Sequence, residues 1–420
     1  MRWISSSKKD EGRTAMPSST SITSEVRNLK TSQITEAPTR FNRRSLPIGV
    51  LGMLALICGV ESTIMRYDFD LTTLVASNWQ IEGKAPARYA AKTEILCFGD
   101  SMVKFGVQPR VLGPSLGRSV YNFALYCGPP QTSYYQLQRA FQTGAKPAAV
   151  LVDFQPEILM CDAMRVTSRT FPEILGFPEL FDLCWTAGDF DHLAEFFAAR
   201  LLPSSRKRFE IRAAFTAAIS GQSASLRDRL IAVKRNWKVN GGAEVLSKNP
   251  YFHGEVPDTG AYPSMFWTPW NANKLSVVYL ERFLNLAAEH QVPVFWLLQP
   301  NAPEVHNRRE QTGYDAQYES FVRGYLEHYP QLTIIDGRHV RYPSSFFTDP
   351  VHLDRSGSTA YSLGIADVLR PFLESGKVAS RWEKLPDRRE RADEVALEDH
   401  GQSAVAIQAK AISDTAKLRR

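Results

Sequence analysis

The chain has 420 residues, of which 44% are hydrophobic and 22% are charged, so it is long enough to bury one sizeable α/β core. Its formal net charge of +6 comes mainly from the two ends and a middle segment, without zinc-finger spacing or an RNA-binding aromatic pattern, so we expect no nucleic-acid partner. The five cysteines form no CxxC pair and do not fix the redox compartment.

The first 66 residues have the composition of a membrane-targeting segment. Residues 1–45 are rich in Ser, Thr, Lys and Arg without hydrophobic periodicity, so we expect them to be disordered. Residues 46–66 follow as an apolar stretch close to the ~20 residues that span a bilayer, with Glu61 near its far end. This pattern predicts a single-pass transmembrane signal anchor, and the preceding Arg43 and Arg44 place everything after residue 66 outside the cytoplasm. A buried globular helix and the core of a signal peptide are the alternatives.

From residue 90 to 375 the chain alternates between apolar runs and helix-length segments. Five runs read as buried strands: 93–98, 119–125, 148–154, 292–298 and 332–336. Four segments read as helices: 133–142, 274–290, 314–328 and 358–373. This order favours parallel pairing with right-handed crossovers, so the predicted fold is α/β, a three-layer α/β/α sandwich with a mainly parallel sheet.

Two segments fall outside this alternation. Residues 162–270 carry a helical stretch at 190–202, a basic stretch and then an aromatic loop, and we expect them to form a helical and aromatic insertion that caps the sheet edge. Residues 376–420 return to a charged, low-aromatic composition and are expected to form a solvated tail, in which a surface helix near 404–418 is possible.

Two short motifs supply the residues of a serine nucleophile site. Gly99-Asp100-Ser101 follows the first predicted strand, and Asp349-Pro350-Val351-His352 precedes the last predicted helix. A serine hydroxyl needs a base to take its proton and a third group to orient that base, and these groups need not be close in sequence. His253, His306 and His339 are rival bases, but none stands in a comparable Asp-x-x-His arrangement.

This pair of motifs resembles the SGNH/GDSL hydrolase superfamily over residues 93–156 and 274–373. The resemblance implies that Ser101 is the nucleophile and that Asp349 and His352 complete a catalytic triad. It also implies an oxyanion hole formed by the Ser101 N–H, a glycine that would be Gly128 and an asparagine from a Gly-x-Asn-Asp block. This chain has Asp153-Phe154-Gln155-Pro156 at that block, so we expect the Gln155 amide to replace the asparagine, with Asn301 as a second possibility.

The resemblance implies a membrane-anchored, extracytoplasmic esterase or O-acyltransferase that acts on acyl esters, with an acylated carbohydrate or cell-envelope glycan as substrate. SGNH-like proteins with an anchor and a large insertion act alongside membrane-bound acyltransferases, so such a partner is also expected by analogy. No metal cluster, phosphate-binding glycine loop or dinucleotide fingerprint is present in the sequence, and we expect no cofactor. The alternative is a catalytically inactive SGNH-fold envelope protein that binds glycan or a membrane partner.

Overall fold

The computed structural model describes residues 48–66, 73–221, 223–260, 262–376 and 380–418, and the chain divides into two compact units, 1–63 and 64–420. The segment predicted to be disordered, 1–45, lies outside the described residues. Helix α1 (Ile48–Arg66) occupies the segment predicted as the anchor. No helix in the described part of the chain is long and apolar enough to cross a membrane.

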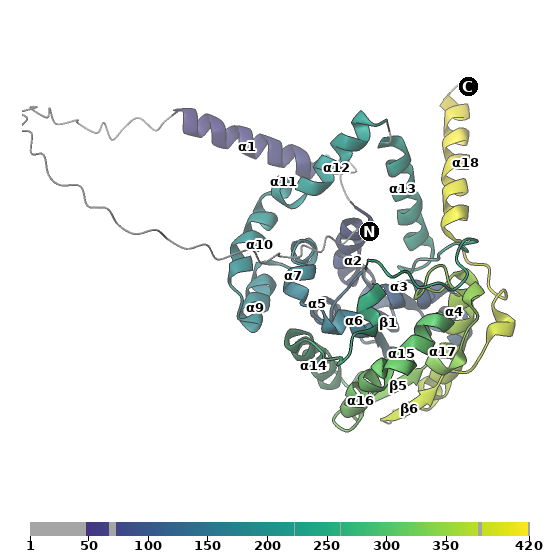
Figure 1. Cartoon of the computed structure of the whole chain (residues 1–420). Coiled ribbons are helices and arrows are strands. Elements are labelled where there is room, and N and C mark those ends of the chain that lie inside the picture. Colours follow the sequence, from purple (N-terminus) through teal and green to yellow (C-terminus); the bar gives the residue numbers. More distant parts are fainter. Residues whose placement is uncertain (1–47, 67–72, 222, 261, 377–379, 419–420) are drawn as a thin grey trace, which may run out of the picture. The chain divides into compact units, whose positions relative to one another are not determined.

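The second unit is built on a six-stranded sheet in which all neighbouring strands are parallel (Figure 1). The spatial order is β2-β1-β3-β4-β5-β6. The strands are β1 (Ile95–Gly99), β2 (Val120–Asn122), β3 (Ala149–Asp153), β4 (Val294–Leu298), β5 (Leu332–Asp336) and β6 (Arg381–Lys384). The predicted α/β class with a mainly parallel sheet is confirmed, and the five predicted strands form β1 to β5. The sixth strand was not predicted.

Helices pack on both faces of this sheet. Side chains alternate between the faces along each strand, so Phe98 and Trp296 enter one apolar cluster while Cys97 and Phe295 enter the other. On the first face lie α5 (Pro130–Gln142), α14 (Lys274–Glu289) and α16 (Tyr314–Leu326). On the second face lie α3 (Ser101–Gly106), α4 (Pro109–Leu116) and α17 (Arg355–Ser375). The four predicted sheet-packing helices correspond to α5, α14, α16 and α17.

The insertion between β3 and β4 is mostly helical. It contains α6 (Pro156–Met160), α7 (Ala163–Val166), α8 (Phe171–Ile174), α9 (Phe177–Ala187), α10 (Asp191–Leu201), α11 (Pro203–Arg206), α12 (Arg208–Ile219) and α13 (Ser223–Val239). Helices α7 to α10 share a separate apolar cluster with α2 (Leu74–Tyr89), centred on the fully buried Trp79. The later part of the insertion, which includes the 3-10 helix Tyr262–Phe266, contributes Met265 to a cluster with Met102 and Val351 at the sheet edge.

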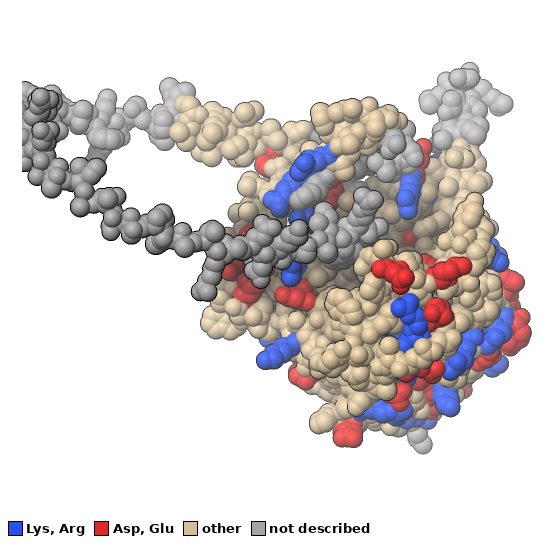
Figure 2. Space-filling view, in the orientation of Figure 1, with Lys and Arg blue, Asp and Glu red and all other residues tan. Residues whose placement is uncertain are grey.

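The C-terminal residues belong to the fold and do not form the solvated tail that the sequence predicts. Strand β6 pairs with β5, and Leu385 and Leu397 beyond it are buried. Helix α18 (His400–Leu418) follows and packs against α13. The charged composition that suggested a tail belongs to an edge strand and to surface positions, which tolerate charge because they keep access to water. Figure 2 shows Lys, Arg, Asp and Glu side chains of both signs on the surface of this unit.

Gly99 is the residue that allows the first strand to turn into α3 beside β3. Its φ of +134° is rarely adopted by other residues, and a Cβ there would lie 2.1 Å from the Asp153 carbonyl oxygen. We expect Gly99→Ala to lower the free energy of unfolding by about 3 kcal/mol or more, because strained backbone and a backbone clash add together. Urea unfolding followed by circular dichroism measures this difference.

Gly117→Ala is the matched control for Gly99→Ala. Gly117 also has a positive φ, of +63°, but no atom lies within 4 Å of the position of a Cβ. Its expected cost is therefore about 1 kcal/mol, from backbone strain alone. Equal losses in the two variants would contradict the close contact assigned to Gly99.

Candidate active site

Ser101 is the first residue of α3, directly after the turn that ends β1. The Asp100 carboxylate caps this helix, since its Oδ1 accepts a hydrogen bond of 2.8 Å from the Met102 N–H. The far end of the helix is also fixed, because the buried Asn122 amide donates to the carbonyl oxygens of Val103 and Val107 at 2.8 and 2.9 Å. Ser101 is therefore held at the carboxyl edge of the sheet by contacts on both ends of a short helix.

The three residues of the two motifs meet in a continuous hydrogen-bonded chain. His352 Nε2 lies 2.9 Å from Ser101 Oγ, and His352 Nδ1 lies 2.7 Å from Asp349 Oδ2. The other Asp349 oxygen accepts from the backbone N–H groups of Val351 and His352 at 2.9 and 2.8 Å. The short Asp-x-x-His turn thus orients the carboxylate and the imidazole together. With Nδ1–H donated to Asp349, Nε2 is free to accept the serine proton.

The contacts among the triad residues shift the pKa values of both Asp349 and His352. Burial acts to raise the pKa of Asp349, but the facing His352 and the two backbone N–H groups outweigh it and hold the pKa below its ordinary value. Burial acts to lower the pKa of His352, but the Asp349 carboxylate outweighs it and raises the pKa above its ordinary value. The pair therefore favours a charged carboxylate that stabilises an imidazolium.

Asp100 connects the nucleophile turn to the end of β3. Its second oxygen, Oδ2, accepts a hydrogen bond of 2.6 Å from the Gln155 N–H. Asp100 is fully buried, and burial raises its pKa to about 7 against the opposing effect of these backbone bonds. Phe105, four residues after Ser101 on the same helix, packs edge-on against the His352 ring with centroids 4.7 Å apart.

The three expected oxyanion-hole residues differ in whether their N–H donors are free to bind an oxyanion. Ser101 lies in the first turn of a helix, where N–H groups have no intrahelical acceptor. The Gly128 N–H donates to the Leu125 carbonyl oxygen at 3.2 Å, so it is engaged in a turn in this conformation. The Gln155 side chain lines a small cavity together with Met102 and Asn301. Gln155 and Asn301 thus share one cavity beside the nucleophile helix.

None of the three rival histidines forms a hydrogen bond with Ser101 among the described residues. His253 is exposed in the loop before the 3-10 helix Tyr262–Phe266, and His339 is exposed after β5. His306 is buried on α15 (Pro303–Thr312), where it faces Glu310 and Asp315. Of the histidines, His352 is the one that the structure places within hydrogen-bond distance of Ser101.

A second polar group behind the triad was missed by sequence reasoning. The buried Glu244 carboxylate accepts from the Tyr126 hydroxyl and from Trp237 Nε1, and it lies 2.7 Å from His400 Nε2. These contacts, with those of His400 foremost, outweigh burial and hold the pKa of Glu244 low. Its negative charge also helps to raise the pKa of His352. Three separate segments form this group, so no local spacing in the sequence indicates it.

Within the residues that the structure describes, no group of three or more His, Cys, Asp or Glu side chains is arranged to hold a metal ion. The expectation that the protein needs no cofactor stays a prediction.

A family model matches residues 87–358, about two thirds of the chain, and describes its members as "Protein of unknown function (DUF1574)". The chain belongs to this family. The DUF1574 match runs from the end of α2 to the first turn of α17, so it includes both motifs and all five expected site residues. Among curated proteins, nothing matches this DUF1574 chain.

The electrostatic coupling between Asp349 and His352 predicts at which pH His352 loses its proton, and the substitution Asp349→Asn should lower that pH. His352 must be neutral to accept a proton, and its pKa is raised, so the neutral form appears only as the pH rises through a value above 6.5. In Asp349→Asn the attracting charge is lost, and we expect the His352 titration midpoint to fall. Nitrogen-detected NMR of the imidazole across the pH range measures both midpoints.

Asp191→Asn, which removes an exposed carboxylate on α10, is the control for this titration and should leave the midpoint unchanged. A His352 midpoint that stays in place or rises in Asp349→Asn would contradict the assigned electrostatics.

Proposed function

We propose that this DUF1574 protein is an SGNH-type serine enzyme, an esterase or O-acyltransferase that acts on acyl esters. The observation that carries the proposal is the unbroken chain from Ser101 Oγ to His352 Nε2 at 2.9 Å and from His352 Nδ1 to Asp349 Oδ2 at 2.7 Å. The packing of helices on both faces of a parallel sheet is consistent with the three-layer SGNH-like sandwich that this proposal includes.

In the proposed reaction Ser101 Oγ attacks the carbonyl carbon of the ester while His352 Nε2 takes the serine proton. The tetrahedral intermediate carries its negative charge on the former carbonyl oxygen, and the Asp349 carboxylate stabilises the imidazolium. The C–O bond to the leaving alcohol then breaks, and His352 returns the proton to that alcohol. Water or an acceptor hydroxyl attacks the acyl-serine with His352 again as base, which regenerates Ser101 and releases an acid or a new ester.

The oxyanion would be held by the Ser101 N–H together with a side-chain amide. Gln155 and Asn301 supply amides in the cavity beside Met102, and the loss of one such donor costs about a hundredfold or more in rate. Gly128 contributes only if its bond to the Leu125 carbonyl opens when substrate binds. Met102 and Val351, the chain neighbours of Ser101 and His352, are buried together in an apolar cluster with Met265, and this apolar packing beside two triad residues supports the proposal.

A second candidate function is a non-catalytic protein that keeps the fold and binds glycan or a membrane partner. Two backbone N–H groups that already have hydrogen-bond acceptors favour it. The Gly128 N–H bonds to Leu125 and the Gln155 N–H bonds to Asp100, so two backbone groups beside the site are already satisfied. An acylated carbohydrate substrate and a membrane-bound acyltransferase partner stay predictions under the enzyme candidate, and a glycan or a membrane partner stays one under the binding candidate.

Labelling with a fluorophosphonate tests whether Ser101 is an activated nucleophile. We expect the full chain to be labelled and Ser101→Ala to lose at least about 10³-fold in labelling rate, because the attacking oxygen is removed. Turnover of p-nitrophenyl acetate, with and without an added sugar acceptor, separates hydrolysis from transfer. The control is Ser115→Ala on the neighbouring α4, which should behave as the wild type. A wild-type chain that is not labelled would favour the binding protein.

The location of the protein outside the cytoplasm is a proposal that can be tested separately. The basic residues before α1 and the exposed apolar side chains along it, such as Leu51, Leu54 and Leu56, support membrane attachment. We expect the full chain to sediment with membranes and a chain lacking residues 1–66 to be released. An alkaline phosphatase fusion after residue 66 should be active, and a fusion before residue 46 inactive. Recovery of the full chain in the soluble fraction would contradict the attachment.

A further inference from the structure

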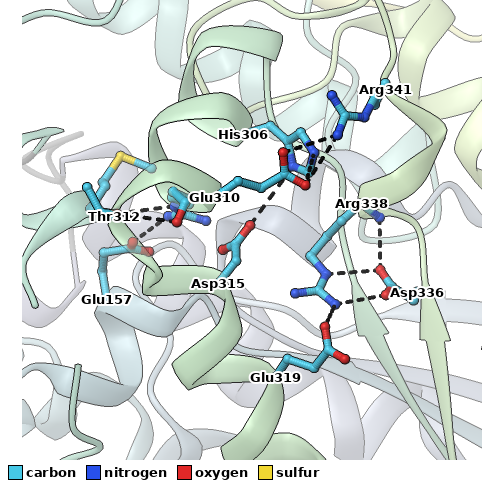
Figure 3. Close-up of polar contacts among 11 residues, drawn as sticks. Glu157, His306, Glu310, Thr312, Asp315, Glu319, Asp336, Arg338 and Arg341 are labelled. Carbon is cyan, nitrogen blue, oxygen red and sulfur yellow. Dashed lines mark hydrogen bonds and ion pairs between the residues drawn. The ribbon is translucent and has the colours of Figure 1, made fainter. Parts of the chain in front are cut away.

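A polar cavity of about 390 Å³ lies beyond the carboxyl end of β5. Its lining includes His306, Glu310, Asp315, Glu319, Asp336 and Arg338. These residues come from α15, α16, the last position of β5 and the turn after it, and Figure 3 shows their side chains converging. The proposed reaction uses none of them.

Most charges around this polar cavity are already paired and form a fixed framework. The Arg338 guanidinium donates to both Asp336 oxygens at 3.0 and 2.8 Å and to Glu319 at 2.9 Å. The Arg341 guanidinium donates to both Glu310 oxygens at 3.2 and 3.1 Å. These pairs hold the cavity wall in place before any ligand enters.

Three buried polar atoms in the wall, on His306 and Asp315, are left without a hydrogen bond. Both ring nitrogens of His306 and the Oδ2 atom of Asp315 lack a hydrogen-bond partner among the described residues, although these side chains belong to residues only 6% and 7% exposed. His306 Nδ1 and Asp315 Oδ2 are 3.9 Å apart, beyond hydrogen-bond distance. His306 Nε2 lies 3.2 Å from Glu310 Oε1 but without the alignment of a hydrogen bond. A buried polar atom without a hydrogen bond is destabilising, so the site is suited to a ligand that bonds to these atoms.

The two groups match the hydrogen-bonding capacity of a hydroxyl. Burial lowers the pKa of His306, so its imidazole is neutral and has one donor and one acceptor nitrogen. Asp315 presents a carboxyl oxygen on the opposite side of the 3.9 Å gap. A hydroxyl oxygen both donates and accepts, and it can lie within hydrogen-bond distance of both atoms at once.

The charges of the cavity wall indicate whether the ligand is anionic or neutral. Burial raises the pKa of the Asp315 carboxyl. The carboxylates of Glu310, Glu319 and Asp336 still outnumber the two guanidiniums in the wall, those of Arg338 and Arg341. This excess of negative charge disfavours an anionic ligand and admits a neutral one. A small cavity lined by Met102 and Gln155 also includes Asp315 and Arg338 in its wall, so the two cavities are adjacent on the same sheet edge as Ser101.

We propose that the polar cavity is a binding subsite for a neutral, hydroxyl-rich sugar unit, one hydroxyl of which bridges His306 and Asp315. The inference rests on the proposed function, because the sugar would be part of the ester substrate or of the acceptor that Ser101 serves. The inference assigns the carbohydrate to the polar cavity, a site that the triad motifs do not indicate.

Saturation-transfer difference NMR on the full chain tests this subsite. The probes are the methyl glycosides of glucose, galactose, mannose and N-acetylglucosamine, with methyl glucuronide as the anionic comparison. We expect at least one neutral glycoside to bind in the millimolar range and the glucuronide to bind at least tenfold more weakly. Asp315→Asn and His306→Gln should each weaken binding at least tenfold, because Asn exchanges one carboxyl oxygen for an NH₂ donor and Gln has no polar atom at the position of His306 Nδ1.

His328→Gln is the matched control, since it changes an exposed histidine at the end of α16 and should leave binding intact. Thermal unfolding of each variant checks that it folds, and if Asp315→Asn does not fold, His306→Gln decides the result. Binding of no neutral glycoside, or binding that both variants retain, would overturn the inference.

Ser101→Ala separates this inference from the proposed function, because it should abolish fluorophosphonate labelling and leave glycoside binding unchanged. Labelling at Ser101 without glycoside binding would overturn the subsite alone. Glycoside binding that depends on Asp315, in a wild-type chain that is not labelled, would support the subsite and overturn the enzyme.

Discussion

The close approach of the β1 turn to the end of β3 sets the position of everything at the carboxyl edge of the sheet. Gly99 pairs with Asp153 in the parallel register, and no side chain fits between them. One residue later the Asp100 carboxylate joins the two turns again, by accepting from Met102 on one side and Gln155 on the other. Ser101 follows immediately, so the position of its hydroxyl is fixed by strands β1 and β3.

Buried polar contacts then fix α3 against the rest of the second unit. Lys104 on α3 forms an ion pair of 2.8 Å with Glu82 on α2, with both side chains fully buried. Burial raises the pKa of Glu82 to about 7 despite this lysine, which shows how strongly the surroundings disfavour charge. Such a pair contributes little net stability, but removing one partner leaves an uncompensated buried group at a cost of about 3–5 kcal/mol. The pair therefore links the position of the nucleophile helix to the small apolar core around Trp79.

The parts of the fold that the sequence predicts are those encoded by local patterns. Strands β1 and β3 to β5 are fully buried runs of apolar residues between turns, and the Asp-x-x-His spacing places a carboxylate and an imidazole in one turn. Strand β6 has the sequence Arg-Trp-Glu-Lys, which has no apolar alternation, so its place in the sheet follows from its neighbour and not from its composition.

The partners of backbone and charged groups are harder to predict, because they depend on loop conformation and on distant segments. Gly128 is next to Cys127, whose φ of +52° sets a turn that directs the Gly128 N–H to Leu125. Glu244 meets Tyr126 and His400 across more than a hundred residues on each side. His306 lies outside the helices that the sequence predicts, and its buried position facing Asp315 follows from the packing of α15 beside α16 and not from a local pattern.

The two outer strands of the sheet also determine how the protein meets other chains. An open strand edge exposes unpaired N–H and C=O groups that can pair with a second molecule and start aggregation. At one edge β2 has only three residues, and the Asn122 N–H already donates to Gly241. At the other edge β6 carries Arg381, Glu383 and Lys384, and the Arg323 guanidinium covers the Trp382 ring at 3.8 Å. Charge and short length thus disfavour the pairing of either edge with a second molecule.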